Sequence, residues 1–119
     1  MNHRIKKALD SVSAFMRGVW PDSKPDFIEV NKPSPVGNGG MYYSIENNAK
    51  SIDICFWDTG VFDISTNLII SDAGDIFYFS HMPQDFKTRK YSDLDIYLFE
   101  EKLNELICLL RKSYSKQTG

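Results

Sequence analysis

The chain has 119 residues, 42% of them hydrophobic, which is enough for one sizeable core and too few for two ordinary domains. Fourteen basic and sixteen acidic residues give a formal net charge of -2, without the basic excess typical of nucleic-acid-binding proteins. A charged fraction of 25% and apolar residues spread along the chain argue against disorder. We therefore expect one folded domain over residues 1–119.

The cysteine content and the absence of long apolar runs indicate the compartment. Cys55 and Cys108 are too few for a disulfide framework, and the chain begins with MNHRIKK, which lacks the apolar core of a signal peptide. No apolar run approaches the roughly 20 residues that span a bilayer. We expect a cytoplasmic protein with reduced thiols and no membrane segment.

An amphipathic helix is predicted from Ile5 to residue 19 or 20. Its apolar positions recur at helical spacing, and they are Ile5, Ala8, Leu9, Val12, Phe15, Met16 and Val19. The polar side of this helix carries Arg4, Lys6, Lys7, Asp10, Ser13 and Arg17. Gly18 weakens the helix and Pro21 disfavours its continuation, so residues 21–25 are predicted to form a loop.

Two strands joined by a wide turn are predicted next. Residues 26–31 alternate weakly between polar and apolar side chains, and the two prolines in 32–35 end this strand. The glycines in 37–40 permit positive φ, which is typical of a turn, and a second strand follows over 41–46. Residues 47–50 are predicted to be another turn.

The clearest β pattern lies in residues 52–70. Gly60 ends a three-residue loop over 58–60, and a left-handed glycine in this position is common in hairpins. Such a loop pairs Cys55 with Asp63 and Asp53 with Ser65. One face of the hairpin is then apolar and consists of Ile52, Ile54, Phe56, Phe62, Ile64, Leu68 and Ile70. The opposite face carries Asp53, Cys55, Trp57, Asp63 and Ser65.

A fifth strand is predicted after the turn Asp72-Ala73-Gly74-Asp75. A turn of two or four residues places Phe77 and Phe79 opposite Ile70 and Leu68, whereas a three-residue turn exposes both rings. Exposure would forfeit roughly 1.5–3 kcal/mol per ring, so we expect the first arrangement. The outer face of this strand then carries Ile76, Tyr78 and Ser80.

A polar loop over 82–91 leads to the second predicted helix. Ser92 is a suitable N-cap, and Asp93 and Asp95 suit the positive end of the helix dipole. Apolar side chains recur at helical spacing, and they are Leu94, Tyr97, Leu98, Leu103, Leu106, Ile107 and Leu110. The helix is expected to close at Arg111-Lys112, followed by a frayed polar tail over 113–119.

Together these elements predict a single α+β domain. An antiparallel β-meander of about five strands would pack one face against the N-terminal and the C-terminal helix. Both helices would share one core.

The sequence contains no pattern that indicates catalysis or a cofactor. His3 and His81 lack the spacing of a zinc site, so both are expected to be solvated surface residues. The cysteines have no CxxC partner, and the glycine-rich segment 37–40 lacks the lysine of a phosphate-binding loop. We expect no enzyme, no metal and no cofactor. Direct nucleic-acid binding is also disfavoured, because the basic residues of the first helix lack interleaved aromatics.

Acidic residues of the central hairpin are the candidate binding residues. Asp53, Asp58 and Asp63 would cluster on its outer face and tip, either as a solvated face or as a contact surface for a basic partner. Trp57 lies among them, and it either joins such a contact or lies half-buried beneath a loop or helix. The candidate partner-binding residues are Asp53, Trp57, Asp58, Asp63, Asp72, Asp75 and Tyr78.

The segment ICFWDTGVFDI, residues 54–64, resembles the central hairpin of small bacterial immunity proteins of the TriTu type, which protect cells from polymorphic or contact-dependent toxins. In that family a strand ends in tryptophan, and an acidic-small-glycine turn and a strand with an inner acidic position follow. An Asp-x-Gly turn, an aromatic strand and an amphipathic C-terminal helix complete the order. The matching features here are Trp57, Asp58-Thr59-Gly60, Asp63, Asp72-Ala73-Gly74, Phe77–Phe79 and Leu94–Leu110.

The resemblance implies a non-enzymatic protein, expected to be a monomer, that binds one cognate toxin domain and blocks its active site or its access to substrate. If the toxin is a nuclease, an acidic face would fit its basic groove. The alternative is a small acidic export chaperone, a dimer that holds an effector segment along its surface. A small enzyme or ligand-binding domain with a pocket in the curved sheet is a further alternative, but the sequence shows no convergent polar groups for it.

Overall fold

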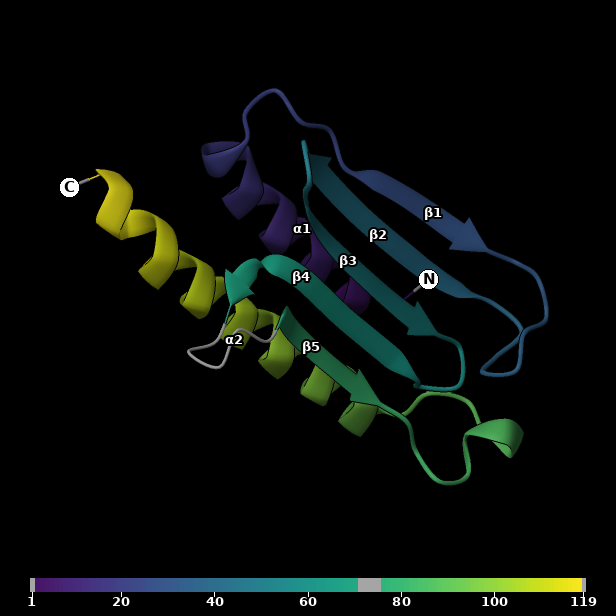
Figure 1. Cartoon of the computed structure of the whole chain (residues 1–119). Helices are drawn as coiled ribbons and strands as arrows, with labels where there is room; N and C mark the ends of the chain where they lie inside the picture. The colour runs from purple at the N-terminus through teal and green to yellow at the C-terminus, as the bar shows by residue number, and fades with distance from the viewer. Residues whose placement is uncertain (1, 71–75, 119) are drawn as a thin grey trace.

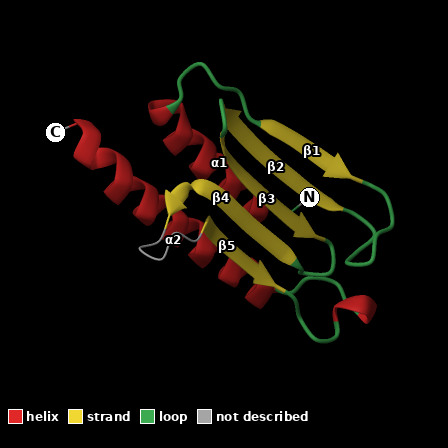
Figure 2. Ribbon diagram, in the orientation of Figure 1, coloured by secondary structure: helices red, strands yellow, loops and turns green. Residues whose placement is uncertain are grey.

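The computed structural model describes residues 2–70 and 76–118, without the side chains of residues 69, 70, 76 and 113–118. The elements are helix α1 (His3–Val19), strands β1 (Asp26–Val30), β2 (Gly40–Asn47), β3 (Lys50–Trp57), β4 (Phe62–Ile70) and β5 (Ile76–His81), the short 3-10 helix η1 (Phe86–Thr88) and helix α2 (Asp93–Thr118). Each strand pairs antiparallel with the next, in the order β1-β2-β3-β4-β5. Both long helices lie on the same side of this sheet (Figures 1 and 2). The structure therefore confirms the predicted α+β fold.

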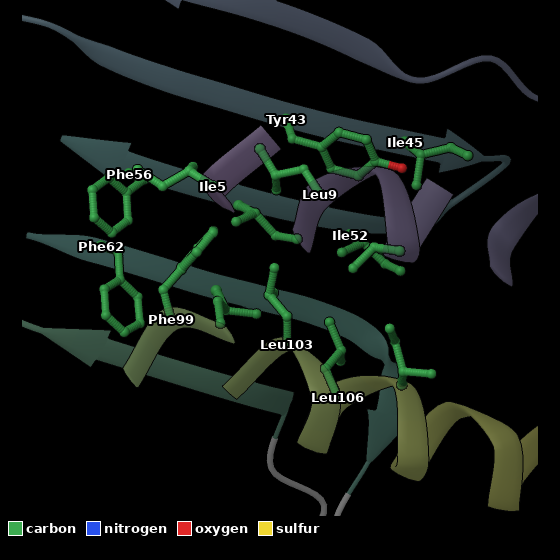
Figure 3. Packing of buried hydrophobic residues seen from close by; sticks show 14 of the residues in the cluster. Ile5, Leu9, Tyr43, Ile45, Ile52, Phe56, Phe62, Phe99, Leu103 and Leu106 are labelled. Atoms are coloured by element: carbon green, nitrogen blue, oxygen red, sulfur yellow. The ribbon is translucent and has the colours of Figure 1, made fainter. Parts of the chain in front are cut away.

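A single hydrophobic cluster fills the space between the sheet and the two helices (Figure 3). Phe99 of α2 packs edge-on against two rings of the central hairpin, with ring centres 4.9 Å from Phe56 and 5.2 Å from Phe62. From α1, the fully buried side chains are Ile5, Leu9, Val12 and Met16. Both helices therefore share one core, as predicted.

Ser13 differs from the helical pattern of the sequence. It lies on the polar side of that pattern, yet it is buried in the structure. Its hydroxyl donates a hydrogen bond of 2.9 Å to the hydroxyl of Tyr43, which is fully buried on β2. Each of these two buried polar groups therefore satisfies the other, as buried hydroxyls generally require.

The hairpin of β3 and β4 has the predicted register. Cys55 lies opposite Asp63, and Asp53 lies opposite Ser65. Gly60 closes the loop with a φ of +95°, a conformation that glycine adopts without the steric cost of a side chain. This register directs the alternate apolar residues of both strands toward the helices.

Strand β5 is shifted relative to the prediction. Phe77 and Phe79 lie opposite Thr66 and Ile64, so each partner is four residues earlier in β4 than expected. The cause is an irregularity in the pairing of the two strands. Thr66 pairs with Phe77 and Ile70 pairs with Ile76, so β4 advances four residues where β5 moves by one. Both rings still pack against the core, so the predicted inner face is confirmed although the predicted partners are wrong. The predicted turn over 72–75 lies outside the described residues.

Helix α2 begins at the predicted place and continues further than expected. The Ser92 hydroxyl accepts a hydrogen bond from the Asp95 amide, and the Asp95 carboxylate accepts one from the Ser92 amide. This reciprocal arrangement is a capping box. The helix then runs to Thr118, beyond the expected end at Arg111-Lys112. No glycine or proline stops the helix before Gly119.

The turn at Gly60 gives a first prediction. A Cβ at this position would lie 2.5 Å from Oδ2 of Asp95, in addition to the strain of a positive φ. We expect Gly60→Ala to lower the free energy of unfolding by about 1–3 kcal/mol in urea denaturation. The matched control is Gly18→Ala, because a Cβ there meets nothing within 4 Å. That helical substitution should raise the free energy of unfolding by about 0.4–1 kcal/mol, and equal effects of the two variants would contradict the prediction.

Candidate functional site

The side of the sheet opposite the helices carries a surface that no described helix covers (Figures 1 and 2). Strand register aligns its outward residues in two adjacent rows across all five strands. One row is Ile28, Tyr42, Cys55, Asp63 and Ser80, and the other is Asp26, Ser44, Asp53, Ser65 and Tyr78. We call these two rows the open face. Its polar groups are hydroxyls, carboxylates and one thiol, and it contains neither lysine nor arginine.

Asp53 lies at the centre of the open face and is held by hydroxyl groups. Its Oδ1 accepts hydrogen bonds from the Tyr42 hydroxyl at 2.7 Å and from Ser44 Oγ at 2.9 Å. Its Oδ2 accepts a third from Ser51 Oγ at 3.1 Å. The hydrogen bond to this carboxylate raises the pKa of Tyr42, with a further contribution from burial. Asp53 therefore organises the face and has little capacity left to bind a partner directly.

Asp63 and Tyr78 are the more accessible pair of the predicted site residues. The Tyr78 side chain is 65% exposed, and its hydroxyl lies 3.4 Å from Oδ1 of Asp63. Cys55 is directly opposite Asp63 on β3. Burial, with the Asp63 charge as a smaller cause, raises the pKa of Cys55 to about 11. The thiol is therefore protonated at neutral pH, which makes it a poor nucleophile.

Trp57 and Asp58 lie at the tip of the central hairpin, against the loop that follows β1. A Cβ at Gly37 would lie 3.3 Å from Cβ and 3.4 Å from Cε3 of Trp57, so the loop backbone covers part of this side chain. The Asp58 carboxylate accepts a hydrogen bond from the Asn38 amide at 3.1 Å, and its other oxygen lies 3.4 Å from Nζ of Lys90. Trp57 is therefore half-buried beneath a loop, which was one of the two arrangements left open by the sequence.

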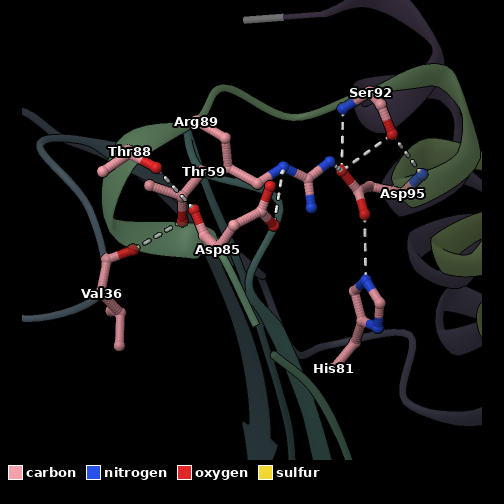
Figure 4. A network of polar contacts seen from close by, with 8 residues as sticks. All are labelled: Val36, Thr59, His81, Asp85, Thr88, Arg89, Ser92 and Asp95. Carbon is pink, nitrogen blue, oxygen red and sulfur yellow. Dashed lines mark hydrogen bonds and ion pairs between the residues drawn. The ribbon is translucent and has the colours of Figure 1, made fainter. Parts of the chain in front are cut away.

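A buried ionic network around Asp95 was not predicted (Figure 4). Asp95 is 3% exposed, and its two carboxylate oxygens contact His81 Nε2 at 3.0 Å and Arg89 Nη2 at 2.5 Å. Oδ2 also accepts hydrogen bonds from the amide and hydroxyl of Ser92. The predicted solvated His81 is therefore wrong, because its side chain is 23% exposed and bound to a carboxylate. The sequence predicted Ser92 as an N-cap and Asp95 as a carboxylate at the start of the helix, but no local pattern connects His81 or Arg89 to them.

The pKa of Asp95 reflects opposing effects. Burial raises it, but the hydrogen bonds from Ser92 and His81 and the charge of Arg89 outweigh this effect, so the pKa lies below its ordinary value of 3.8. The network joins the end of β5, the loop after it and the start of α2. Next to it, the Tyr91 amide donates to the Asp58 carbonyl at 2.9 Å. The network therefore fixes the loop that lies against the hairpin tip.

The predicted binding residues fall into three groups. Asp53, Asp63 and Tyr78 share the open face. Trp57 and Asp58 lie at the hairpin tip, beside the open face. Asp72 and Asp75 lie outside the described residues. The structure thus brings most of the described candidates to one side of the molecule.

Comparison with known proteins adds no assignment. No protein-family model matches the chain, and no curated protein or solved structure matches it either. Within the described residues, no group of three or more His, Cys, Asp and Glu side chains is placed to hold a metal ion. None of the described helices is both long enough and apolar enough to cross a membrane. The open face and the hairpin tip are therefore the features from which a function is proposed.

The Asp95 network gives a second prediction. We expect Asp95→Asn to lower the free energy of unfolding by about 1–3 kcal/mol at neutral pH, because His81 and Arg89 lose a buried carboxylate partner. The folded pKa is depressed, so this contribution is present above the unfolded pKa and lost as the pH falls through the folded pKa. The difference between wild type and variant in urea denaturation should therefore shrink below about pH 4.

Asp93→Asn is the matched control for this variant. Asp93 lies in the same first turn of α2 and is exposed, so its substitution should change stability by only about 0.3–1 kcal/mol through the helix dipole. A difference between wild type and Asp95→Asn that stays constant down to about pH 3 would contradict the assigned role of the carboxylate.

Proposed function

We propose that this protein is a bacterial immunity protein that binds a cognate toxin domain and blocks its active site or its access to substrate. The observation that carries the proposal is the open face, two rows of outward residues that cross all five strands and that no described helix covers. Its carboxylates and hydroxyls stand without a lysine or arginine among them. The resemblance of residues 54–64 to the central hairpin of TriTu immunity proteins supports the same function.

The chemistry of the open face suits a basic protein surface. Asp26 and Asp63 supply negative charge that would speed association with a positively charged groove and would compete with an anionic substrate for it. Tyr78 and Ile28, which are 65% and 50% exposed, offer apolar contact area on the outer strands. A nuclease domain is therefore the kind of toxin that this face fits best.

Two potentially reactive groups of the open face are unsuited to catalysis, which favours binding. Asp53 accepts three hydrogen bonds from neighbouring hydroxyls, and Cys55 remains a thiol at neutral pH. General acid–base or nucleophilic chemistry needs a group with a suitable pKa within reach of a substrate. We therefore propose a non-enzymatic role.

An exposed sheet edge supports a second candidate function, an export chaperone. Strand β1 is the outermost strand at one end of the sheet, with Phe27 and Ile28 38% and 50% exposed. An extended segment of an effector could add to such an edge through backbone hydrogen bonds. A chaperone of this kind would be a dimer and would bind an unfolded segment, whereas an immunity protein would bind a folded toxin domain.

Growth and co-purification distinguish these functions. The toxin candidate is the C-terminal domain of a large protein encoded directly upstream, expressed in cells with and without this protein. Rescue of growth, together with a one-to-one complex of the folded domain in size-exclusion chromatography, is the expected result. Continued killing without a complex would contradict the immunity function, and a dimer that binds only an unfolded segment would favour the chaperone.

A third prediction concerns the open face. We expect the double variant Asp63→Lys/Tyr78→Ala to weaken binding of the toxin domain by at least about tenfold in isothermal titration calorimetry, because it reverses a charge and removes an exposed ring. Asp10→Lys, an exposed charge reversal on α1, is the matched control and should leave the affinity within about twofold. Equal affinity of both variants would exclude the open face as the interface.

A further inference from the structure

A hollow of about 360 Å³ lies where the loop after β1 meets the β3–β4 turn. This volume falls within the roughly 300–1,000 Å³ that is typical of ligand pockets. The residues that line it include three aromatic residues, two carboxylates and two side-chain amides, which are Phe56, Trp57, Tyr91, Glu29, Asp58, Asn31 and Asn38. None of the residues that line it is basic.

Two glycines line the hollow at places where backbone segments pack closely. At Gly40, a Cβ would lie 2.5 Å from the Phe56 carbonyl oxygen, and at Gly39 one would lie 2.8 Å from the Val30 carbonyl oxygen. The backbone therefore packs too closely here for any larger residue. The half-buried side chains of Trp57 and Tyr91 are the aromatic groups at the hollow, because Phe56 is only 1% exposed and its ring lies in the core. The Tyr91 ring meets the buried Phe56 ring edge-on, with centres 5.7 Å apart.

The position of Tyr91 is fixed by its neighbours. Its amide donates to the Asp58 carbonyl at 2.9 Å, and the next residue, Ser92, is bound through its amide and hydroxyl to Asp95. Tyr91 is therefore held in place before any ligand binds. Such preorganisation reduces the entropy that binding would otherwise cost.

A cation of the chain already lies at the rim of the hollow. Nζ of Lys90 is 3.4 Å from Oδ2 of Asp58, while the Lys90 side chain is 78% exposed. An ion pair this exposed contributes little stability and is easily exchanged for another cation. The remaining oxygen of Asp58 accepts a hydrogen bond from the Asn38 amide, which orients the carboxylate.

We propose that this hollow receives an arginine side chain of the protein partner, whose guanidinium replaces Lys90 at Asp58. A planar guanidinium can bind a carboxylate through two hydrogen bonds and also stack on an aromatic ring, which a lysine ammonium does not match. Glu29 supplies a second negative charge in the same wall. The inference rests on the proposed function, because a basic toxin domain supplies the arginine, and it extends the interface from the open face to the hairpin tip.

The first test uses a small probe and needs no toxin. N-acetyl-arginine methylamide is titrated into the 15N-labelled protein, and the neutral N-acetyl-citrulline methylamide serves as its matched control. Saturable shifts of the Asn38, Gly39 and Gly40 amide signals with the arginine probe alone are expected. Equal shifts with both probes, or no saturable shift, would overturn the inference.

Variants of the hollow sharpen this test. Glu29→Gln/Asp58→Asn should weaken probe binding at least about fivefold, because the guanidinium loses both charges. Lys90→Ala should strengthen it by about twofold, since the internal competitor is removed. Asp63→Asn, a charge-neutralising change on the open face, should leave probe binding unchanged. Urea denaturation of each variant shows that it is folded, and an unaltered affinity in the first two variants would overturn the inference.

The toxin complex separates this inference from the proposed function. Glu29→Gln/Asp58→Asn should also weaken binding of the toxin domain about tenfold. If the toxin domain binds this variant as tightly as wild type while Asp63→Lys/Tyr78→Ala binds weakly, the arginine pocket is excluded and the immunity function stands. If no toxin domain binds but the arginine probe does, the pocket is supported and the immunity function is excluded.

Discussion

Much of the fold depends on the contact between Gly60 and the carboxylate of Asp95. The left-handed conformation of Gly60 closes the β3–β4 loop in three residues and so determines which side chains of both strands face the helices. A change of one residue in this register would place Phe56 and Phe62 on the opposite side of the sheet. Because the Asp95 carboxylate packs against the same glycine, the start of α2 is positioned relative to the turn that sets the register.

The sequence predicts the elements of this fold well because their patterns are local. Alternation over 52–64 and helical spacing in the terminal segments each depend on neighbouring residues only. The register of β5 could not be derived in this way, because the irregularity between Thr66 and Ile70 adds residues to one strand without a local signal. The Asp95 network is similar, since His81 and Arg89 come from a strand end and a loop that meet the helix only after folding.

The sequence predicts which face carries the candidate residues, but it does not predict which of their carboxylates already accept hydrogen bonds. Strand alternation places Asp53 and Asp63 on the same face, as the structure confirms. Alternation cannot distinguish a free carboxylate from one that accepts three hydrogen bonds, because Tyr42 and Ser44 come from the neighbouring strand β2. The same limit applies to Trp57, whose burial depends on how the loop containing Gly37 lies over it.

The edge strand β1 combines exposure with protection. Its five residues carry the exposed Phe27 and Ile28, a composition that would ordinarily promote sheet-to-sheet association. Pro25 precedes this strand and Pro33 follows it, and proline has no backbone N–H to donate to a neighbouring strand. Lys24 and Lys32, each next to one of these prolines, add positive charge. Another strand can therefore form backbone hydrogen bonds with β1 over only a few residues, and lysines flank this stretch at both ends. The sheet is consequently guarded against the repeated strand addition of a fibril, whereas one short segment of a partner could still pair with the five residues of β1.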